Sequence, residues 1–426
     1  MSLLIHGATV VTSLSPPVVA RLDIQVDSGR IVALAPSLAV GGPAIDATGC
    51  LVIAGNVNAH MHAYSALARG MPYRLAPPTS FREILERVWW RLDRALDPDS
   101  IRASALVAAR EALLAGTTTL IDHHASPNAI SGSLEIVARA FDEVGIRSAL
   151  CYEVSDRDGP ERARAGVQEN ERFVNHVSGG AFPLARGMVG AHAAFTLSDK
   201  TLADCAALAR DAGVGLHIHV AEDAIDSGAV RRLADAGALD HRTLAAHAVH
   251  VTSDEAALLL ERGVTVAHNP RSNMNNGVGR TPLGLLTGPV ALGTDGIGSD
   301  MFEEARAGFF RRHEEELSVE PAWALDRLAA GAELSGRIFD EPLIGRIAVG
   351  APADLAVLDY DPPTPLEAQS LAGHWIFGIT GARVRDVLVG GELVVRDRRL
   401  TRVDEGALAA TARKESERLW ARMEAL

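Results

Sequence analysis

Lysine is nearly absent from this chain of 426 residues, in which only Lys200 and Lys414 occur, and the formal net charge is −13. Nucleic-acid surfaces need clustered Lys and Arg to meet the phosphates. The chain has no such cluster beyond short pairs such as Arg311 and Arg312. We therefore do not expect it to bind nucleic acid.

Cysteine is also scarce. Cys50, Cys151 and Cys205 are odd in number and far apart, which argues against a disulfide framework and favours a reducing compartment. The sequence opens with no secretory hydrophobic segment, and no apolar run approaches the roughly 18 residues of a membrane span. These absences predict a cytoplasmic protein with no membrane segment.

The length and the order of apolar runs predict a (β/α)8 barrel with a small appended domain, because a barrel of about 250 residues fills most of such a chain. Residues 1–55 and 346–403 both show short alternating runs separated by turn signals, and we expect them to form one β-sandwich domain. In residues 56–345 strand-like and helix-like stretches alternate, which indicates a parallel sheet with crossover helices. Residues 404–426 predict an outer amphipathic helix.

Eight apolar runs are the candidate barrel strands. They are Leu51–Ile53, Thr118–Ile121, Arg147–Tyr152, Leu184–Val189, Gly215–Ile218, Thr243–Ala245, Thr265–Ala267 and Val290–Leu292. The predicted helices are Phe81–Leu96, Pro98–Ala115, Leu134–Val144, Arg162–His176, Lys200–Ala212, Ala229–Ala236, Ser253–Glu261 and Met301–Glu316. In a barrel of this kind the chemistry lies at the C-terminal ends of the strands.

His60 and His62 follow the first of these runs and its glycine, Gly55. Side chains at i and i+2 of a strand point to the same side, so two imidazoles face one place there. With 15 histidines in the chain, one such pair is weak evidence for a metal site.

Further polar residues follow later apolar runs. His219 and Glu222 come after one, His247 after the next, and Asp295 after the last. Each has an ordinary alternative: a satisfied buried histidine, a glutamate at a helix start, or an aspartate in a loop turn. Their occurrence in chain order at successive strand ends favours one shared metal site.

These motifs resemble those of the amidohydrolase superfamily, in the branch of cytosine, guanine and S-adenosylhomocysteine deaminases and triazine hydrolases. The resemblance spans nearly the whole chain and is carried by residues 54–62, 219–222, 267–273 and 292–296. Residues 64–71, 89–93 and 122–127 are most similar to SsnA-type aminohydrolases. Ala54 stands where the branch usually has proline, a backbone detail that leaves the ligand assignment intact.

The resemblance implies a site of defined composition. One metal ion is implied to bind His60, His62, His219 and Asp295. Glu222 and His247 are implied to handle protons, and His192 and Ser299 to meet the substrate. Spacing alone leaves open whether His247 or His250 faces the metal.

The chemistry of the implied ligands agrees with this site. Three imidazoles and one carboxylate suit Zn²⁺, with Fe²⁺ or Mn²⁺ as alternatives, and such an ion makes bound water acidic near pH 7. We expect Asp295 or His247 to orient that water and take its proton, and Glu222 to carry a proton to a ring nitrogen. The predicted reaction is hydrolytic deamination of an amino-substituted heterocycle, a purine, pterin or pyrimidine, with release of ammonia.

Two alternatives remain open. A single metal site also permits hydrolysis of another C–N or C–X bond, as in a cyclic amide or a substituted triazine, and a non-catalytic metal-binding protein is the other alternative. Two-metal cyclic amidases of the superfamily bridge their ions with a carboxylated lysine, and neither Lys200 nor Lys414 follows a predicted strand. The cysteine-ligated deaminases are excluded because their Pro-Cys-x-x-Cys motif is missing.

Other residues carry weaker signals. Arg69 opens a segment rich in Pro and Gly and can meet a carbonyl or anionic group, and His123 follows a strand and can reach the substrate. Trp89 and Trp90 are expected to pack between helices, although one of them can line the pocket. A homodimer is possible, and the partner is otherwise a small heterocyclic molecule.

Overall fold

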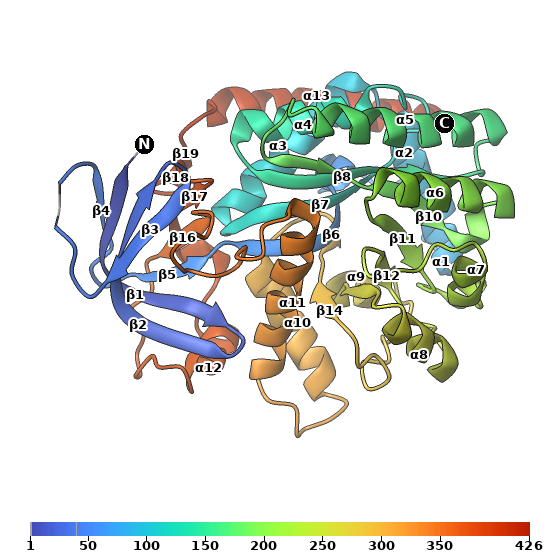
Figure 1. Cartoon of the computed structure of the whole chain (residues 1–426). Coiled ribbons are helices and arrows are strands. Elements are labelled where there is room, and N and C mark those ends of the chain that lie inside the picture. Colours follow the sequence, from blue (N-terminus) through green and yellow to red (C-terminus); the bar gives the residue numbers. More distant parts are fainter. Residues whose placement is uncertain (1, 40) are drawn as a thin grey trace.

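The computed structural model describes residues 2–39 and 41–426, and its strands form two sheets (Figure 1). Both ends of the chain contribute to the first sheet, whose order is β19-β18-β17-β16-β5-β1-β2-β3 with β4 beside β1. Its strands are β1 (Leu3–Leu14), β2 (Pro17–Asp27), β3 (Arg30–Ala35), β4 (Ala44–Asp46), β5 (Leu51–Ala54), β16 (Leu355–Leu358), β17 (Val384–Val389), β18 (Glu392–Arg396) and β19 (Arg399–Leu400). The pairing joins these strands in one sheet, so a separate β-sandwich is not confirmed.

Gly7 lies inside β1, where the sequence predicted a break between two short strands. Its φ of 79° lets the strand pass through a bulge between Ile5 and Ala8. A Cβ at this position would lie 2.5 Å from Thr48 Oγ1. The glycine therefore bends the strand without ending it.

The second sheet is parallel and curled, with the order β14-β13-β12-β11-β10-β8-β7-β6-β15 and β9 beside β8. Its strands are β6 (Asn56–His62), β7 (Thr117–His124), β8 (Arg147–Val154), β9 (Ala185–Gly187), β10 (Val189–Ala193), β11 (Leu216–Val220), β12 (Leu244–His247), β13 (Thr265–His268), β14 (Val290–Leu292) and β15 (Asp295–Gly296). Their burial on both faces explains their nearly continuous apolar runs.

One strand prediction was wrong. Leu51–Ile53, taken as the first barrel strand, lies in β5 and pairs with β1 and β16 in the terminal sheet. The first strand of the parallel sheet is β6, which is separated from β5 by a single residue. A Cβ at this connecting residue, Gly55, would lie 2.1 Å from Thr118 Oγ1, so the chain turns between the sheets at a residue that has no room for a side chain.

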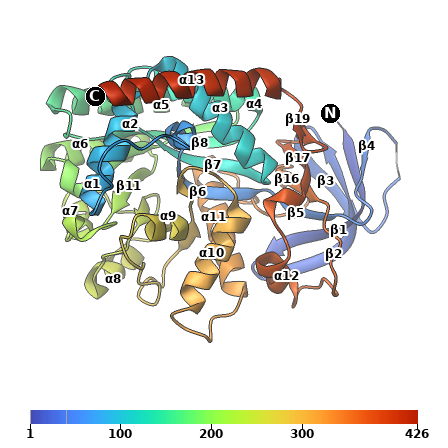
Figure 2. The ribbon, with the colours of Figure 1, turned by 180° about the vertical axis from the view of Figure 1, so that it is seen from behind.

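Helices cover the parallel sheet (Figures 1 and 2). They are α1 (Phe81–Ile84), α2 (Trp90–Ala95), α3 (Pro98–Leu114), α4 (Ser133–Val144), α5 (Pro160–Ser178), α6 (Asp199–Ala212), α7 (Ala229–Asp235), α8 (Ser253–Glu261), α9 (Pro270–Asn275), α10 (Met301–His313), α11 (Ala322–Phe339), α12 (Leu371–Phe377) and α13 (Glu405–Ala425). Gly145 and Gly213 end α4 and α6 in the left-handed conformation, as expected of C-terminal caps.

The last helix, α13, runs along α3 and α2 on the outside of the molecule (Figure 2). Trp420 Nε1 donates to Leu67 O at 2.9 Å, and Arg91 donates to Met423 O. The helix thereby fixes the segment that follows β6. Within the described residues, no helix is both long enough and apolar enough to cross a membrane.

Candidate metal and substrate site

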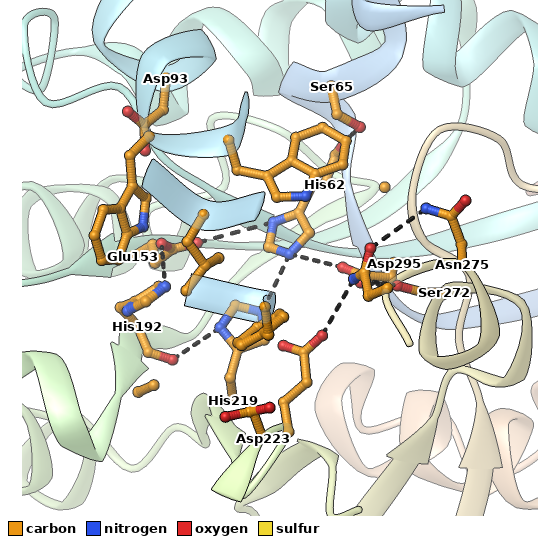
Figure 3. Close-up of a pocket in the computed structure, with 18 of the residues that line it drawn as sticks. His62, Ser65, Asp93, Glu153, His192, His219, Asp223, Ser272, Asn275 and Asp295 are labelled. Carbon is orange, nitrogen blue, oxygen red and sulfur yellow. Dashed lines mark hydrogen bonds and ion pairs between the residues drawn. The ribbon is translucent and has the colours of Figure 1, made fainter. Parts of the chain in front are cut away.

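The C-terminal ends of the parallel strands bring the predicted metal ligands together. His60 and His62 come from β6, His219 from β11 and Asp295 from β15, and all four are buried. Figure 3 shows His62, His219 and Asp295 pointing toward one another. Residues more than 230 positions apart thus meet because parallel strands end at the same edge.

The distances within this cluster are short. His62 Nε2 lies 3.0 Å from Asp295 Oδ1 and 3.2 Å from His219 Nε2, and His60 Nε2 lies 3.4 Å from Asp295 Oδ1. Two overlapping groups of four have ligand atoms within 4.8 Å of one another and share His60 and His219. One group adds His62 and His123, and the other adds His247 and Asp295. The predicted ligand set takes His62 from the first group and Asp295 from the second.

Backbone carbonyls orient two of the imidazoles. His62 Nδ1 donates to His123 O at 2.6 Å, and His219 Nδ1 donates to His192 O at 2.8 Å. With Nδ1 bonded to a carbonyl, each ring turns its Nε2 toward the other across 3.2 Å, and either nitrogen can bind a cation when it carries no proton. His60 Nε2 is buried and has no hydrogen-bond partner among residues 2–39 and 41–426. Converging ring nitrogens and an orphaned nitrogen beside a carboxylate fit a divalent cation.

Burial and pairing set the charges in the cluster. Burial lowers the pKa of His60 to about 4, so its ring is neutral, as a metal ligand must be. Burial alone raises the pKa of Asp295, but the close His60 and His62 imidazoles hold that pKa well below its usual range. Burial also opposes a charge on His62, yet Asp295 raises the pKa of His62 to about 9. The cluster therefore holds an ionised carboxylate that attracts positive charge.

Glu222 and His247 lie next to this cluster. His247 Nε2 is 3.5 Å from Glu222 Oε2 and 3.9 Å from Asp295 Oδ2, while His247 Nδ1 bonds Asn273 Oδ1 at 2.8 Å. Burial raises the pKa of Glu222 to about 7, which suits a group that takes and returns a proton near neutral pH. His250 instead bonds Val278 O at 2.7 Å, so His247 is the histidine that faces the site.

Strained backbone occurs at two of these residues and beside a third. Ala221, His247 and Asp295 have φ values of 46°, 74° and 59°, a region that residues other than glycine rarely adopt. Ala221 directly follows β11, His247 ends β12 and Asp295 begins β15. Such strain commonly marks a functional site.

A cavity of about 280 Å³ opens beside the cluster. Among the predicted substrate-binding residues, only His192 lines it. Ser299 is buried against Asn58 Nδ2 at 3.3 Å, and His123 lies behind the ligands with its Nδ1 3.5 Å from Glu153. Arg69 pairs with Glu111 outside the cavity. The structure therefore does not place Ser299, His123 or Arg69 against a substrate in this cavity.

Sequence reasoning missed several polar residues of the cavity wall, among them Glu153, Ser272 and Asn276. Glu153 lies near the end of β8 and 3.6 Å from His192 Nε2, and Ser272 Oγ donates to Asp295 Oδ2 at 2.5 Å. Asn276 Nδ2 donates to Glu222 Oε1 at 3.3 Å. Glu153 was detectable, because it directly follows a predicted strand like the other candidates. Ser272 and Asn276 belong to α9 and its C-terminal cap, a short helix that the sequence did not predict.

We expect the variant Gly293→Ala to lose bound metal and activity. A Cβ there would lie 2.5 Å from Asn269 Oδ1 and 2.8 Å from His60 N, so β6 and its ligands must shift. Displacement by about 1 Å costs on the order of 100-fold in rate. Metal content and turnover measure the effect. Gly284→Ala is the matched control because no described atom lies within 4 Å of its added Cβ, and equal loss in both variants would contradict the expectation.

Acid should destabilise the fold through two buried histidines. Burial lowers the pKa of His124 and of His268 to about 3 from the ordinary 6.5. Below pH 6.5 the unfolded chain binds protons that the folded chain excludes, so stability is lost as the pH falls toward 3. Each of these two histidines lowers the free energy of unfolding by up to about 1.4 kcal/mol for every pH unit of acidification in this range. Thermal melts from pH 7 to 4 should show a smaller drop for His268→Asn than for the control His6→Asn, and identical slopes would disprove this assignment.

Comparison with known proteins places this geometry in context. Residues 51–394 match the model of the amidohydrolase family. A 5-methylthioadenosine/S-adenosylhomocysteine deaminase of Natronomonas pharaonis is 33% identical, with 99% of each chain covered. Among solved structures, a zinc-bound adenosine deaminase from Xanthomonas campestris has a TM-score of 0.85 at 25% identity, covering 98% of each chain. A zinc-bound atrazine chlorohydrolase from Arthrobacter aurescens has a TM-score of 0.81 at 22% identity, covering 97% of this chain and 100% of its own, and shows the same fold.

Proposed function

Because this chain belongs to the amidohydrolase family, we propose that it is a metal-dependent hydrolytic deaminase that releases ammonia from an amino-substituted, purine-like heterocycle. Relatives named as deaminases of adenosine-type compounds support the reaction and the substrate class. The observation that carries the proposal is the pairing of Glu222 with His247 at 3.5 Å beside the ligand cluster. A site that only stored metal would need no such pair.

The proposed cofactor is one Zn²⁺ ion, held by His60, His62, His219 and Asp295. Its donor set of three imidazoles and a carboxylate suits zinc, and the zinc bound to the Xanthomonas campestris enzyme supports the choice. When bound, the ion supplies acidity, because it lowers the pKa of water from 15.7 toward about 7.

The remaining steps belong to the side chains of this chain. His247, whose Nδ1 is tied to Asn273, presents its Nε2 lone pair to the site and orients the attacking water with Asp295. Glu222 takes a proton at Oε2 and delivers it to a ring nitrogen of the substrate, since its pKa of about 7 permits both states. The water oxygen forms a bond to the carbon that carries the amine as the ring nitrogen receives its proton. A second proton from that oxygen then passes to the amine nitrogen, the C–N bond breaks, and ammonia leaves as a carbonyl forms at the carbon.

The fold supports a finer description. We infer a closed (β/α)8 barrel, because the residues between β14 and β15 bond both neighbouring strands: Gly293 N donates to His268 O and Thr294 N donates to His60 O. We assign the barrel to residues 56–345, the small β domain to 1–55 and 346–403, and the outer helix to 404–426.

The test is metal analysis together with an ammonia-release screen over aminopurines, adenine nucleosides, aminopterins, cytosine and aminotriazines. We expect about one zinc ion per chain and the fastest release from a purine-type compound. Chelation should abolish turnover, and added Zn²⁺ should restore it. A purified protein that carries the metal but releases ammonia from none of these compounds would refute deamination.

A further inference from the structure

Asp93 lies in the cavity wall on the side remote from Ser272 and Asn275 (Figure 3). It belongs to α2, which follows a π-helical turn at Leu85–Trp89. Such a turn is rare and frequently accompanies functional sites, because it rotates the side chains that follow. Trp89, Trp90 and Asp93 all reach the cavity as a result.

One carboxylate oxygen of Asp93 is held and the other is free. Arg157 pairs with Oδ2, and the side chain of Asp93 is only 2% exposed. Oδ1 is buried and has no hydrogen-bond partner among the described residues. Buried polar oxygens in native proteins nearly always find a partner, so an unpartnered oxygen on a residue that lines the cavity points to a donor on the bound molecule.

Arg157 is fixed in place by its other neighbours. Its Nε lies 3.1 Å from Asp158 Oδ2, and its guanidinium carbon lies 5.2 Å from the centre of the Trp90 ring. Asp158 in turn bonds Arg94 Nε at 2.8 Å. Asp93 therefore cannot rotate to exchange its two oxygens without losing a buried ion pair, and Oδ1 keeps a constant position.

The charge of the cavity adds a second constraint. Its lining contains six carboxylates, namely Asp93, Glu153, Glu222, Asp223, Asp226 and Asp295. Within the described part of the chain, Arg271 is the only lining residue of type Arg or Lys, and it pairs with Glu303 and Glu304. Such a wall attracts hydrogen-bond donors and repels anions.

We propose that Asp93 determines substrate specificity by accepting a hydrogen bond at Oδ1 from an N–H or O–H group of an uncharged nitrogen heterocycle or its nucleoside. Analogues without that donor, or with a carboxylate or phosphate, are rejected. This inference rests on the proposed deaminase function and narrows its substrate class. Asp93 acts on binding and takes no part in the proton transfers assigned to Glu222.

The experiment compares wild type with Asp93→Asn and with the control Asp99→Asn. Both changes remove one carboxylate, but the Asp99 side chain is 70% exposed on α3 and does not line the cavity. Because Arg157 keeps the amide oxygen, the new amide of Asp93→Asn would turn its NH₂ toward the cavity and replace an acceptor by a donor. The probes are two pairs, adenosine with 2′,3′-dideoxyadenosine and 2,6-diaminopurine with adenine, together with adenosine 5′-monophosphate.

We expect Asp93→Asn to lower kcat/KM for ammonia release by roughly 100-fold for the donor-bearing member of at least one pair, because a site built for a hydrogen bond rejects mismatched groups strongly. The member without the donor should change less than about threefold, and Asp99→Asn should resemble wild type. The proposal would be overturned by equal losses of kcat/KM for both members of each pair. It would also be overturned if wild type turned over adenosine 5′-monophosphate as fast as adenosine.

Calorimetric binding of the same compounds separates this inference from the proposed function. If no compound releases ammonia, the proposed deaminase function is refuted. The role of Asp93 is still supported if wild type binds the donor-bearing compounds more tightly and Asp93→Asn removes that preference. The role of Asp93 is overturned if wild-type protein binds both members of each pair equally, or binds neither. Asp93→Glu, which keeps the charge beside Arg157 but displaces the oxygens, replaces Asp93→Asn if that variant does not fold.

Discussion

Glu222→Gln is expected to keep the metal and lose turnover by on the order of 10²–10⁴-fold, the usual contribution of a positioned acid–base group. The amide oxygen of the new glutamine can still accept the hydrogen bond from Asn276 Nδ2, which lies 3.3 Å from Glu222 Oε1. The amide can no longer take up a proton and deliver it to the substrate. Steady-state kcat on the best substrate of the screen measures the loss. Metal analysis of the same preparation shows whether the site itself is intact.

Glu261→Gln is the control for this variant, because its side chain is 70% exposed at the end of α8 and removal of its charge should leave kcat unchanged. A Glu222→Gln protein with nearly full activity would remove the carboxylate from the mechanism. A protein that instead lost its metal would assign Glu222 to the ligand set.

Asp295→Asn is expected to lose both metal and activity. Asp295 contributes the only carboxylate of the proposed ligand set and lies 3.0 Å from His62 Nε2 and 3.4 Å from His60 Nε2. Removal of groups that merely support a ligand typically weakens metal binding by about 10–100-fold, so removal of the ligand charge should exceed about 100-fold. Competition with a chromogenic chelator measures the affinity.

Asp254→Asn serves as the matched control, because its side chain is 83% exposed and does not line the cavity. It should retain wild-type affinity. If Asp295→Asn bound metal as tightly as the control, the group in which His123 takes the place of Asp295 would become the ligand set.

Strand-end motifs allowed much of the site to be predicted from sequence. His60, His62, His219 and Asp295 each follow an apolar run, and the ends of parallel strands meet at one edge whatever the details of the loops. The helices α3, α4 and α8 were predicted within a few residues because their caps and periodicity are local.

Features that depend on contacts between residues distant in the sequence were predicted less well. Leu51–Ile53 has the composition of a barrel strand, and only its pairing with β16, some 300 residues away, assigns it to the other sheet. Arg69 seemed free for a substrate, but Glu111 of α3 pairs with it. The helix α11 was not predicted at all, although it contacts β6 and β14. Asp93 was identified only as part of the motif at residues 89–93, because its pairing with Arg157, which follows β8, depends on the fold.

The single residue between β5 and β6 couples the two ends of the chain to catalysis. β5 is held by β16, and β6 carries His60 and His62, so the strand made from residues 355–358 steadies the start of the ligand strand from outside the parallel sheet. Trimming the polypeptide to the parallel sheet and its helices would remove β16 and leave the histidine strand without this anchor. Engineering or evolutionary exchange of the parallel sheet must therefore carry both flanking segments along with it.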